Sequence, residues 1–85
     1  ASYQLAKDKL EMAKKNLQVR YAEYEKRKNH LRKSQLEFER FANIVQKKEE
    51  LRTVGAISEE ELNNLKLELE AKEIAVKNAN RDVEM

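Results

Sequence analysis

The chain has no cysteine, no proline and no tryptophan, and its only glycine is Gly55. Without cysteine, a zinc site would have to combine carboxylates with the one histidine, His30, and structural zinc sites do not use such a ligand set. Proline and glycine are the residues that most often interrupt a helix, so little in the sequence would end one before position 55. The sequence therefore predicts long helices, no metal site and no cofactor.

Long hydrophobic runs are also missing, and aromatic residues make up only 6% of the chain. No apolar stretch approaches the roughly 20 residues that cross a bilayer as a helix. Charged residues make up 40% of the chain, a level compatible with disorder. Helix-forming residues dominate, however, and the apolar residues recur with a fixed period, which favours a coiled coil.

That period is seven residues. A strict seven-residue repeat keeps one side of a helix facing a partner only if the helices supercoil left-handedly. We call this stripe the seam; its first part is Tyr3, Leu10, Leu17, Tyr24, Leu31, Phe38 and Val45, and its second part is Leu62, Leu69, Val76 and Val83. The two parts predict an all-α fold, an antiparallel two-helix coiled-coil hairpin with a longer N-terminal helix. The expected boundaries are 1–54 for the first helix, 55–57 for the turn and 58–85 for the second helix.

Local signals agree on the turn. Gly55 can adopt the left-handed conformation that ends a helix. Ser58 and Glu61 match a capping box, in which Ser58 is the N-cap and Glu61 reaches back to it. Ile57 and Leu62 occupy the two positions of a hydrophobic staple. We therefore expect a tight, well-defined connection.

An antiparallel register around this turn interleaves large and small residues. The expected pairs are Val45 with Leu65, Phe41 with Leu69, Phe38 with Lys72, Ser34 with Val76, and Leu31 with Ala79. This register leaves residues 1–24, which we call the overhang, without a partner inside the chain. At 1.5 Å per residue, the overhang is about 36 Å of helix.

The overhang is apolar on two sides, and such a helix is normally covered on two sides. We expect it to pack against other copies of the chain or other parts of a larger protein. The residues for this self-association are Tyr3, Leu5, Leu10, Met12, Leu17, Val19 and Tyr24. A three-helix fold with a break near Asn29 and His30 is the alternative, although neither glycine nor proline stands there.

Charge is divided between the two arms. Residues 1–57 hold 14 Lys/Arg against 8 Asp/Glu, and residues 58–85 hold 4 against 8. Folding the second arm onto the first sets opposite charges side by side, which favours pairing and orientation.

Residues 7–33 are the most basic part of the chain, with 10 Lys/Arg against 4 Asp/Glu. Binding of nucleic acid or of an anionic membrane surface through this segment is one alternative function. A basic DNA-reading helix would precede its zipper, whereas the seam residues Tyr24 and Leu31 run through this segment. The pattern thus argues against nucleic acid and indicates a charged flank.

The sequence also argues against an enzyme. Catalysis needs a concave site whose groups have perturbed pKa values, and a two-helix rod offers none. His30 is expected to face solvent beside the seam. No glycine-rich phosphate loop is present, so no small-molecule substrate and no catalytic residues are expected.

The stretch from Leu51 to Leu62 reads LRTVGAISEEEL, and it resembles the hairpin turn of HlyD-like membrane fusion proteins, also called periplasmic adaptors. In that family, a Gly-Ala-Ile-Ser type turn joins two long antiparallel helices. The resemblance implies that this chain is the structural hairpin of a bacterial export system. The parent protein would lie in the periplasm, anchored in the inner membrane.

The resemblance also implies partners. Such adaptors link an inner-membrane transporter to an outer-membrane channel of the TolC type. Their hairpins stand side by side, commonly with sixfold symmetry, and their tips meet the channel. A scaffold or cytoskeletal coiled coil with a merely similar turn is the alternative.

The family's tip motif is Arg-x3-Leu-x6-Ser. Leu51 and Ser58 occupy its second and third positions, and Lys47 replaces the arginine at the first. Lysine keeps the charge but lacks the planar fork that binds bidentately, and Arg52 is the candidate to compensate. The resemblance therefore assigns channel docking to Lys47, Leu51, Arg52 and Ser58.

Overall fold

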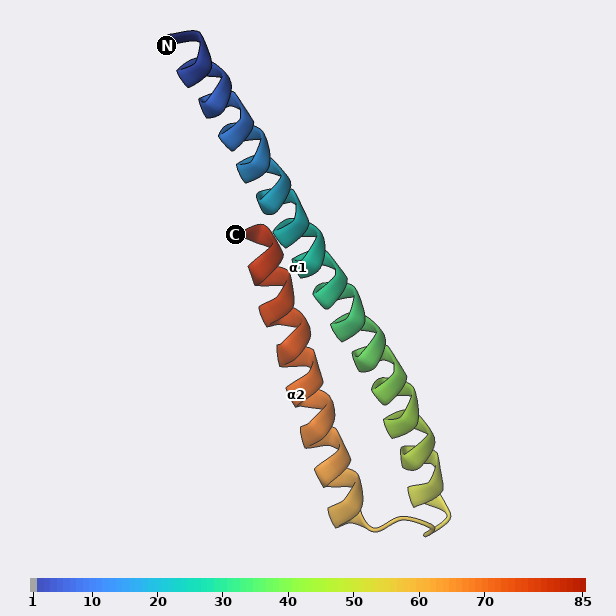
Figure 1. Cartoon of the computed structure of the whole chain (residues 1–85). Coiled ribbons are helices and arrows are strands. Elements are labelled where there is room, and N and C mark those ends of the chain that lie inside the picture. The colour runs from blue at the N-terminus through green and yellow to red at the C-terminus, as the bar shows by residue number, and fades with distance from the viewer. Residues whose placement is uncertain (1) are drawn as a thin grey trace.

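The structure, a computed structural model that describes residues 2–85, is an antiparallel hairpin of two helices (Figure 1). Helix α1 spans Ser2–Thr53 and helix α2 spans Glu59–Glu84. The molecule is a rod with extents of 81 × 14 × 14 Å. The predicted fold class is confirmed, since the described residues form a helical hairpin whose N-terminal helix is the longer.

The helix ends differ slightly from the expected boundaries. α1 ends at Thr53, one residue before the predicted end, because Val54 already belongs to the turn. Ser58 precedes α2 as its N-cap, with extended backbone angles, and Met85 is the C-cap. Residue 1, which the predicted first helix includes, lies outside the described residues.

The end of α1 is closed by two backbone hydrogen bonds that surround Gly55. The amide of Ala56 donates to the carbonyl of Leu51 at 2.9 Å, and the amide of Gly55 donates to the carbonyl of Arg52 at 3.0 Å. Gly55 has a φ of 75°, in the left-handed region. These bonds define a Schellman motif, in which the two inner carbonyls of the last turn find donors after the helix has ended.

The start of α2 is capped by Ser58. Its hydroxyl accepts a hydrogen bond from the amide of Glu61 at 3.1 Å. Its carbonyl accepts the first helical bond, from Leu62, at 3.1 Å. The acidic side chains of the first turn lie where the helix dipole favours negative charge. A rigid cap on each side of a short connection holds the two arms in one geometry.

The two helices pack along the seam. The most buried side chains are Ser34, Val45, Leu62 and Ala79, with exposed fractions of 7%, 4%, 1% and 2%. Ser34 and Ala79 are small, so the helices approach closely where larger neighbours lie opposite them. Half-buried positions complete the interface: Arg27, Leu31, Phe38, Phe41 and Ala42 on α1, and Leu65, Leu69, Lys72, Val76 and Val83 on α2.

One side chain makes a contact that the expected pairing does not include. The ammonium of Lys72 lies 5.3 Å from the centre of the Phe41 ring. Phe41 is about one helical turn nearer the tip than Phe38. Because Lys72 is long and flexible, it reaches diagonally across the interface while its stem stays on the seam.

Two ion pairs join the arms near the turn. Lys66 and Glu49 approach to 2.9 Å, and Arg52 and Glu59 to 3.4 Å. All four side chains are about half exposed or more, so each pair contributes only about 0.5 kcal/mol. These pairs fix orientation more than they add stability.

α2 covers only part of α1. Figure 1 shows the C-terminus of α2 lying part way along α1, well short of the N-terminus. Every residue from Ser2 to Tyr24 is exposed, and half-buried positions begin at Glu25. Among the described residues, neither helix holds a stretch apolar enough to cross a bilayer.

The turn gives a first prediction. Gly55→Ala should lower the free energy of unfolding by about 1 kcal/mol, because a side chain disfavours the left-handed conformation. Apart from Gly55 and its two chain neighbours, no atom of the described residues lies within 4 Å of the position that a Cβ would take, so the cost is one of backbone conformation. Thermal unfolding followed by circular dichroism measures it.

Gly55→Asn is the matched control, because asparagine tolerates positive φ better than alanine. It should recover part of the lost stability. Equal unfolding temperatures for the native chain and Gly55→Ala would contradict the assigned cap.

Candidate functional site: the tip and the overhang

Two surfaces of the rod stand out, one at each end. We call residues 47–62 the tip; it comprises the last two turns of α1, the connection and the first turn of α2 (Figure 1). The overhang, described from residue 2 to residue 24, forms the other end. Between them the two helices cover each other along the seam.

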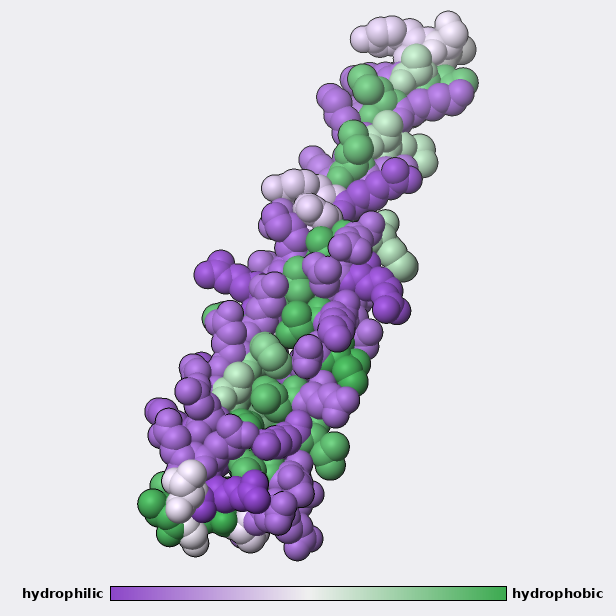
Figure 2. Space-filling model, turned by 180° about the vertical axis from the view of Figure 1, so that it is seen from behind, coloured by the Kyte–Doolittle hydropathy of each residue, from purple (hydrophilic) through white to green (hydrophobic). Residues whose placement is uncertain are grey.

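The tip presents apolar side chains to solvent. Val54 is 76% exposed and Leu51 is 41% exposed, although both are aliphatic. Figure 2 shows a few hydrophobic side chains at this end of the molecule, beside hydrophilic ones. Ile57 is half-buried and Leu62 is buried, so the staple side of the turn faces inward while the Val54 side faces out. An exposed apolar patch on a rigid turn is suited to contact with another protein.

The docking candidates do not all lie together. Lys47 and Leu51 are one turn apart on α1, so they share a face of that helix. Arg52 instead pairs with Glu59 across the turn and lines a hollow beside Lys66. The charge of Arg52 is therefore partly balanced within the chain. This makes Arg52 a weaker substitute for the motif arginine, whose position Lys47 occupies.

Ser58 has its hydroxyl engaged as the N-cap, and the residue is exposed. A hydroxyl that accepts from a backbone amide still has a proton to donate. Capping and contact with a partner at the tip are therefore chemically compatible.

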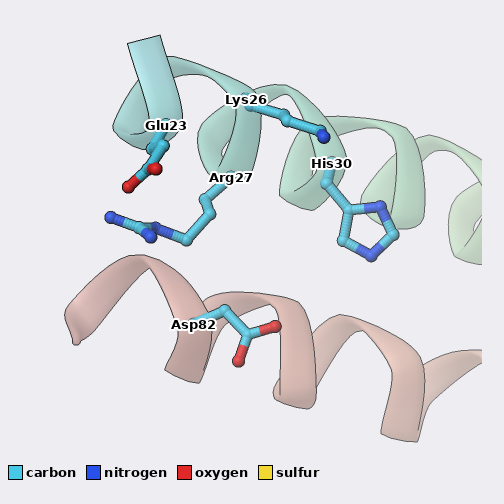
Figure 3. Close-up of a pocket in the computed structure, with 5 residues that line it drawn as sticks. All are labelled: Glu23, Lys26, Arg27, His30 and Asp82. Carbon is cyan, nitrogen blue, oxygen red and sulfur yellow. The ribbon is translucent and has the colours of Figure 1, made fainter. Parts of the chain in front are cut away.

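A hollow of about 310 Å³ lies where α2 ends against α1, lined by Glu23, Lys26, Arg27, His30 and Asp82. Figure 3 shows Arg27 and His30 reaching from α1 towards α2, with Asp82 on the facing helix. The Nε of Arg27 is buried and has no hydrogen-bond partner among the described residues. Charges of both signs line the hollow, so it offers no selective field for an anion or a cation. The described residues hold no cluster of three or more potential metal ligands.

The overhang exposes apolar side chains along its whole length. The exposed residues and their fractions are Tyr3 80%, Leu5 58%, Leu10 56%, Met12 65%, Leu17 66%, Val19 55%, Tyr21 67% and Tyr24 41%. Figure 2 shows hydrophobic and hydrophilic side chains alternating over this narrow end of the rod. So many large apolar groups on one unpaired helix mark a surface that a partner would cover.

The outer sides of the paired region carry opposite charge and a few apolar groups. On α1, four exposed cations recur every seven residues, namely Lys26, Lys33, Arg40 and Lys47. α2, by contrast, has more acidic than basic residues. Leu36 on α1, and Leu67 and Ile74 on α2, are each at least half exposed.

Comparison with protein-family models, with curated proteins and with solved structures finds no match to this chain.

Sequence reasoning missed two of these features. Val54, the most exposed large apolar residue of the tip, lies in the turn, whereas the sequence predicts it at the end of the first helix. Its position directly before the helix-ending glycine is the signal, because that residue is only half within the helix. The stripe from Lys26 to Lys47 was visible as a seven-residue repeat of cations.

Ser58 gives a second prediction. Ser58→Ala should cost about 1 kcal/mol of stability, because the amide of Glu61 loses its acceptor. Ser58→Asp keeps a capping acceptor and should retain stability close to that of the native chain. Chemical denaturation of the three chains checks this. If Ser58→Asp lost as much stability as Ser58→Ala, the hydroxyl would contribute more than the capping hydrogen bond.

Proposed function

We propose that this chain is the structural and docking hairpin of a periplasmic adaptor, linking an inner-membrane transporter to an outer-membrane channel of the TolC type for export. The observation that carries the proposal is the tip: an exposed apolar turn, held by a cap on each side, at the end of a rod 81 Å long. The resemblance of residues 51–62 to the adaptor turn supplies the identity of the partner.

The shape of the molecule is that of a spacer. It is long in one direction and narrow in the other two, and its two helices bury only the seam between them. The surfaces that such a rod offers to other proteins are its end and its sides.

The sides of the rod support assembly from several copies. The cation stripe on α1 and the acidic excess on α2 would attract each other between neighbouring hairpins. Leu36 on α1, with Leu67 and Ile74 on α2, would add apolar contact on the outer faces. A neighbour-to-neighbour contact of this kind uses two different surfaces and closes into a ring if the rotation allows it. Sixfold closure rests on the family resemblance alone.

Docking would use Leu51 and Val54 as apolar contacts and Lys47 as the charged contact. Lys47 is exposed and shares a helix face with Leu51, so both can meet one partner surface. Ser58 lies across the connection and offers its remaining hydrogen-bonding capacity. The periplasm is the compartment that this function requires.

Binding of the chain to a purified TolC-type channel tests the proposal. Leu51→Ser should weaken binding at least about tenfold, because it removes an apolar contact at the centre of the tip. Ile44→Ser is the matched control, since Ile44 is an aliphatic residue of the same helix outside the tip, and its exposed fraction of 40% is close to the 41% of Leu51. Equal loss in both variants, or no binding by the native chain, would contradict docking through the tip.

Lys47→Arg gives a gain-of-function prediction. The arginine fork can bond bidentately to a carboxylate or to two carbonyls, which should strengthen binding about fivefold. Lys15→Arg, at an exposed lysine outside both the tip and the cation stripe, is the control and should leave binding unchanged. If the chain were instead a scaffold coiled coil with a similar turn, neither substitution would change binding to the channel.

A further inference from the structure

The four ion pairs among the described residues all lie on one side of the hairpin, which we call the paired side. The pairs are Glu25 with Lys28, Glu49 with Lys66, Arg52 with Glu59, and Glu73 with Lys77. Glu49, Arg52 and Lys66 line one hollow between the helices. Lys28 lies three seven-residue repeats before Glu49. Glu59 and Glu73 lie one repeat on either side of Lys66, so each pair has a member on the side of that hollow.

The opposite side, which we call the open side, carries charges without ion-pair partners. Lys47 and Glu68 belong to it, because each is two residues, or about 200° around the helix, from a residue of the paired side. The cation stripe from Lys26 to Lys47 therefore runs along α1 on the open side. An acidic row with the same spacing runs along α2, namely Glu61, Glu68 and Asp82, with Ala75 between the last two. All of these residues are exposed, and none of the charged ones forms an ion pair among the described residues.

The two rows match in level along the rod. Lys26 and Asp82 line one hollow, so they lie at the same level (Figure 3). Because the helices are antiparallel, equal steps towards the tip along each helix give the other levels. These are Lys33 with Ala75, Arg40 with Glu68, and Lys47 with Glu61. Each acidic residue of the row thus has a cation of the stripe at its level, and the cation without one has an alanine.

We propose that two copies of the chain pair through their open sides, around a two-fold axis parallel to the rod, with both tips at the same end. This rotation sets α2 of each copy against α1 of the other and preserves every level. The cation stripe of each copy then faces the acidic row of the other. Complementary charges meet at the levels of Lys26, Arg40 and Lys47, which favours this orientation of the two copies.

Other arrangements of two copies oppose like charges. Turning the second copy end for end sets α1 against α1, so the cation stripe of one copy faces the cation stripe of the other. Setting the open side of one copy on the paired side of the next, at equal levels, brings Lys33 beside Arg32 and Glu68 beside Glu70. Only the two-fold arrangement with the tips together pairs each acidic residue of the row with a cation.

The remaining residues of the open side fit this contact. Ala71 and Ala75 are exposed and small, so the partner's α1 approaches α2 closely between the charged levels. Glu37, an acidic residue of α1 on this side, is level with Ala71 rather than with an acidic residue. The charged rows therefore flank a small-residue centre, and no carboxylate of the acidic row meets Glu37.

The pairing involves only the part of the rod in which both helices are present. Its charged levels lie between residues 26 and 82, and the overhang makes no contribution. It follows from the hairpin itself and does not rest on the proposed export role, with which it agrees in setting hairpins side by side with their tips together. The backs of the helices, with Leu36 on α1 and Ile74 on α2, stay free for contact between such pairs.

Sedimentation equilibrium of charge-reversed chains tests the contact. At about 50 mM salt the native chain should dimerise, and Arg40→Glu should raise the dimer dissociation constant at least about tenfold, because Glu68 of the other copy then meets a like charge. Arg32→Glu is the matched control, since it makes the same change of charge at an exposed residue of α1 off the stripe. A native chain that stays monomeric, or equal effects of the two substitutions, would overturn the proposal.

Mixing two charge-reversed chains tests which residues meet. Glu68→Arg alone should weaken dimerisation as Arg40→Glu does. An equimolar mixture of the two should form a mixed dimer about as tight as the native one, because each reversed charge meets an opposite charge in the other chain. Mixing would not repair a folding defect in either chain. A mixture that associates no better than its components would contradict the contact between Arg40 and Glu68.

Cross-linking checks the direction of the two copies. The chain has no cysteine, so single-cysteine variants carry no background. Lys33 and Ala75 share a level without an ion pair, so Lys33→Cys and Ala75→Cys spare the charged levels. Their mixture, treated with a short thiol cross-linker, should yield mainly the mixed dimer. Preferential linking of either variant to itself would indicate α1 on α1 or α2 on α2 and would refute the arrangement. None of these experiments involves the channel, so failure here is distinct from failure of docking at the tip.

Discussion

The structure depends on one mismatch of length. α1 carries a continuous apolar seam over most of its length, and α2 is long enough to cover only the part nearest the tip. The covered part holds the hairpin together through the burial of a few side chains, led by Leu62, Val45 and Ala79. The uncovered part keeps the same chemistry without a partner. The packing of the hairpin and the exposed apolar surface of the overhang both follow from this stripe.

The turn makes the two ends of the molecule different: one end is the closed tip, and the other is the unpaired part of α1. Gly55 ends α1 and Ser58 starts α2, and each does so with backbone or side-chain hydrogen bonds that satisfy helix termini. Because both caps are local, the turn needs no support from a larger core. It can therefore project Leu51 and Val54 into solvent while Leu62 stays buried beneath them. The tip is suited to a partner protein, and the overhang to a second helix.

The distribution of charge favours one orientation of the two helices. The basic excess of α1 faces the acidic excess of α2 within the hairpin, and the Arg52–Glu59 pair at 3.4 Å is one outcome. Exposed ion pairs contribute little energy, but like charges would oppose other registers. The cations that face outward, from Lys26 to Lys47, retain their charge for use between molecules.

The sequence by itself determined the two helices, the site of the turn and the seam, because heptad spacing, a glycine C-cap and a serine N-cap act over a few neighbouring residues. It also indicated which part of the seam lacks a partner, since that follows from counting residues on each side of Gly55. Only the tertiary structure decided that the ammonium of Lys72 lies over the Phe41 ring, that Arg52 pairs with Glu59, and that the Nε of Arg27 is buried. These features depend on the conformations that long side chains adopt among the neighbours from both helices, and a seven-residue repeat does not specify those conformations.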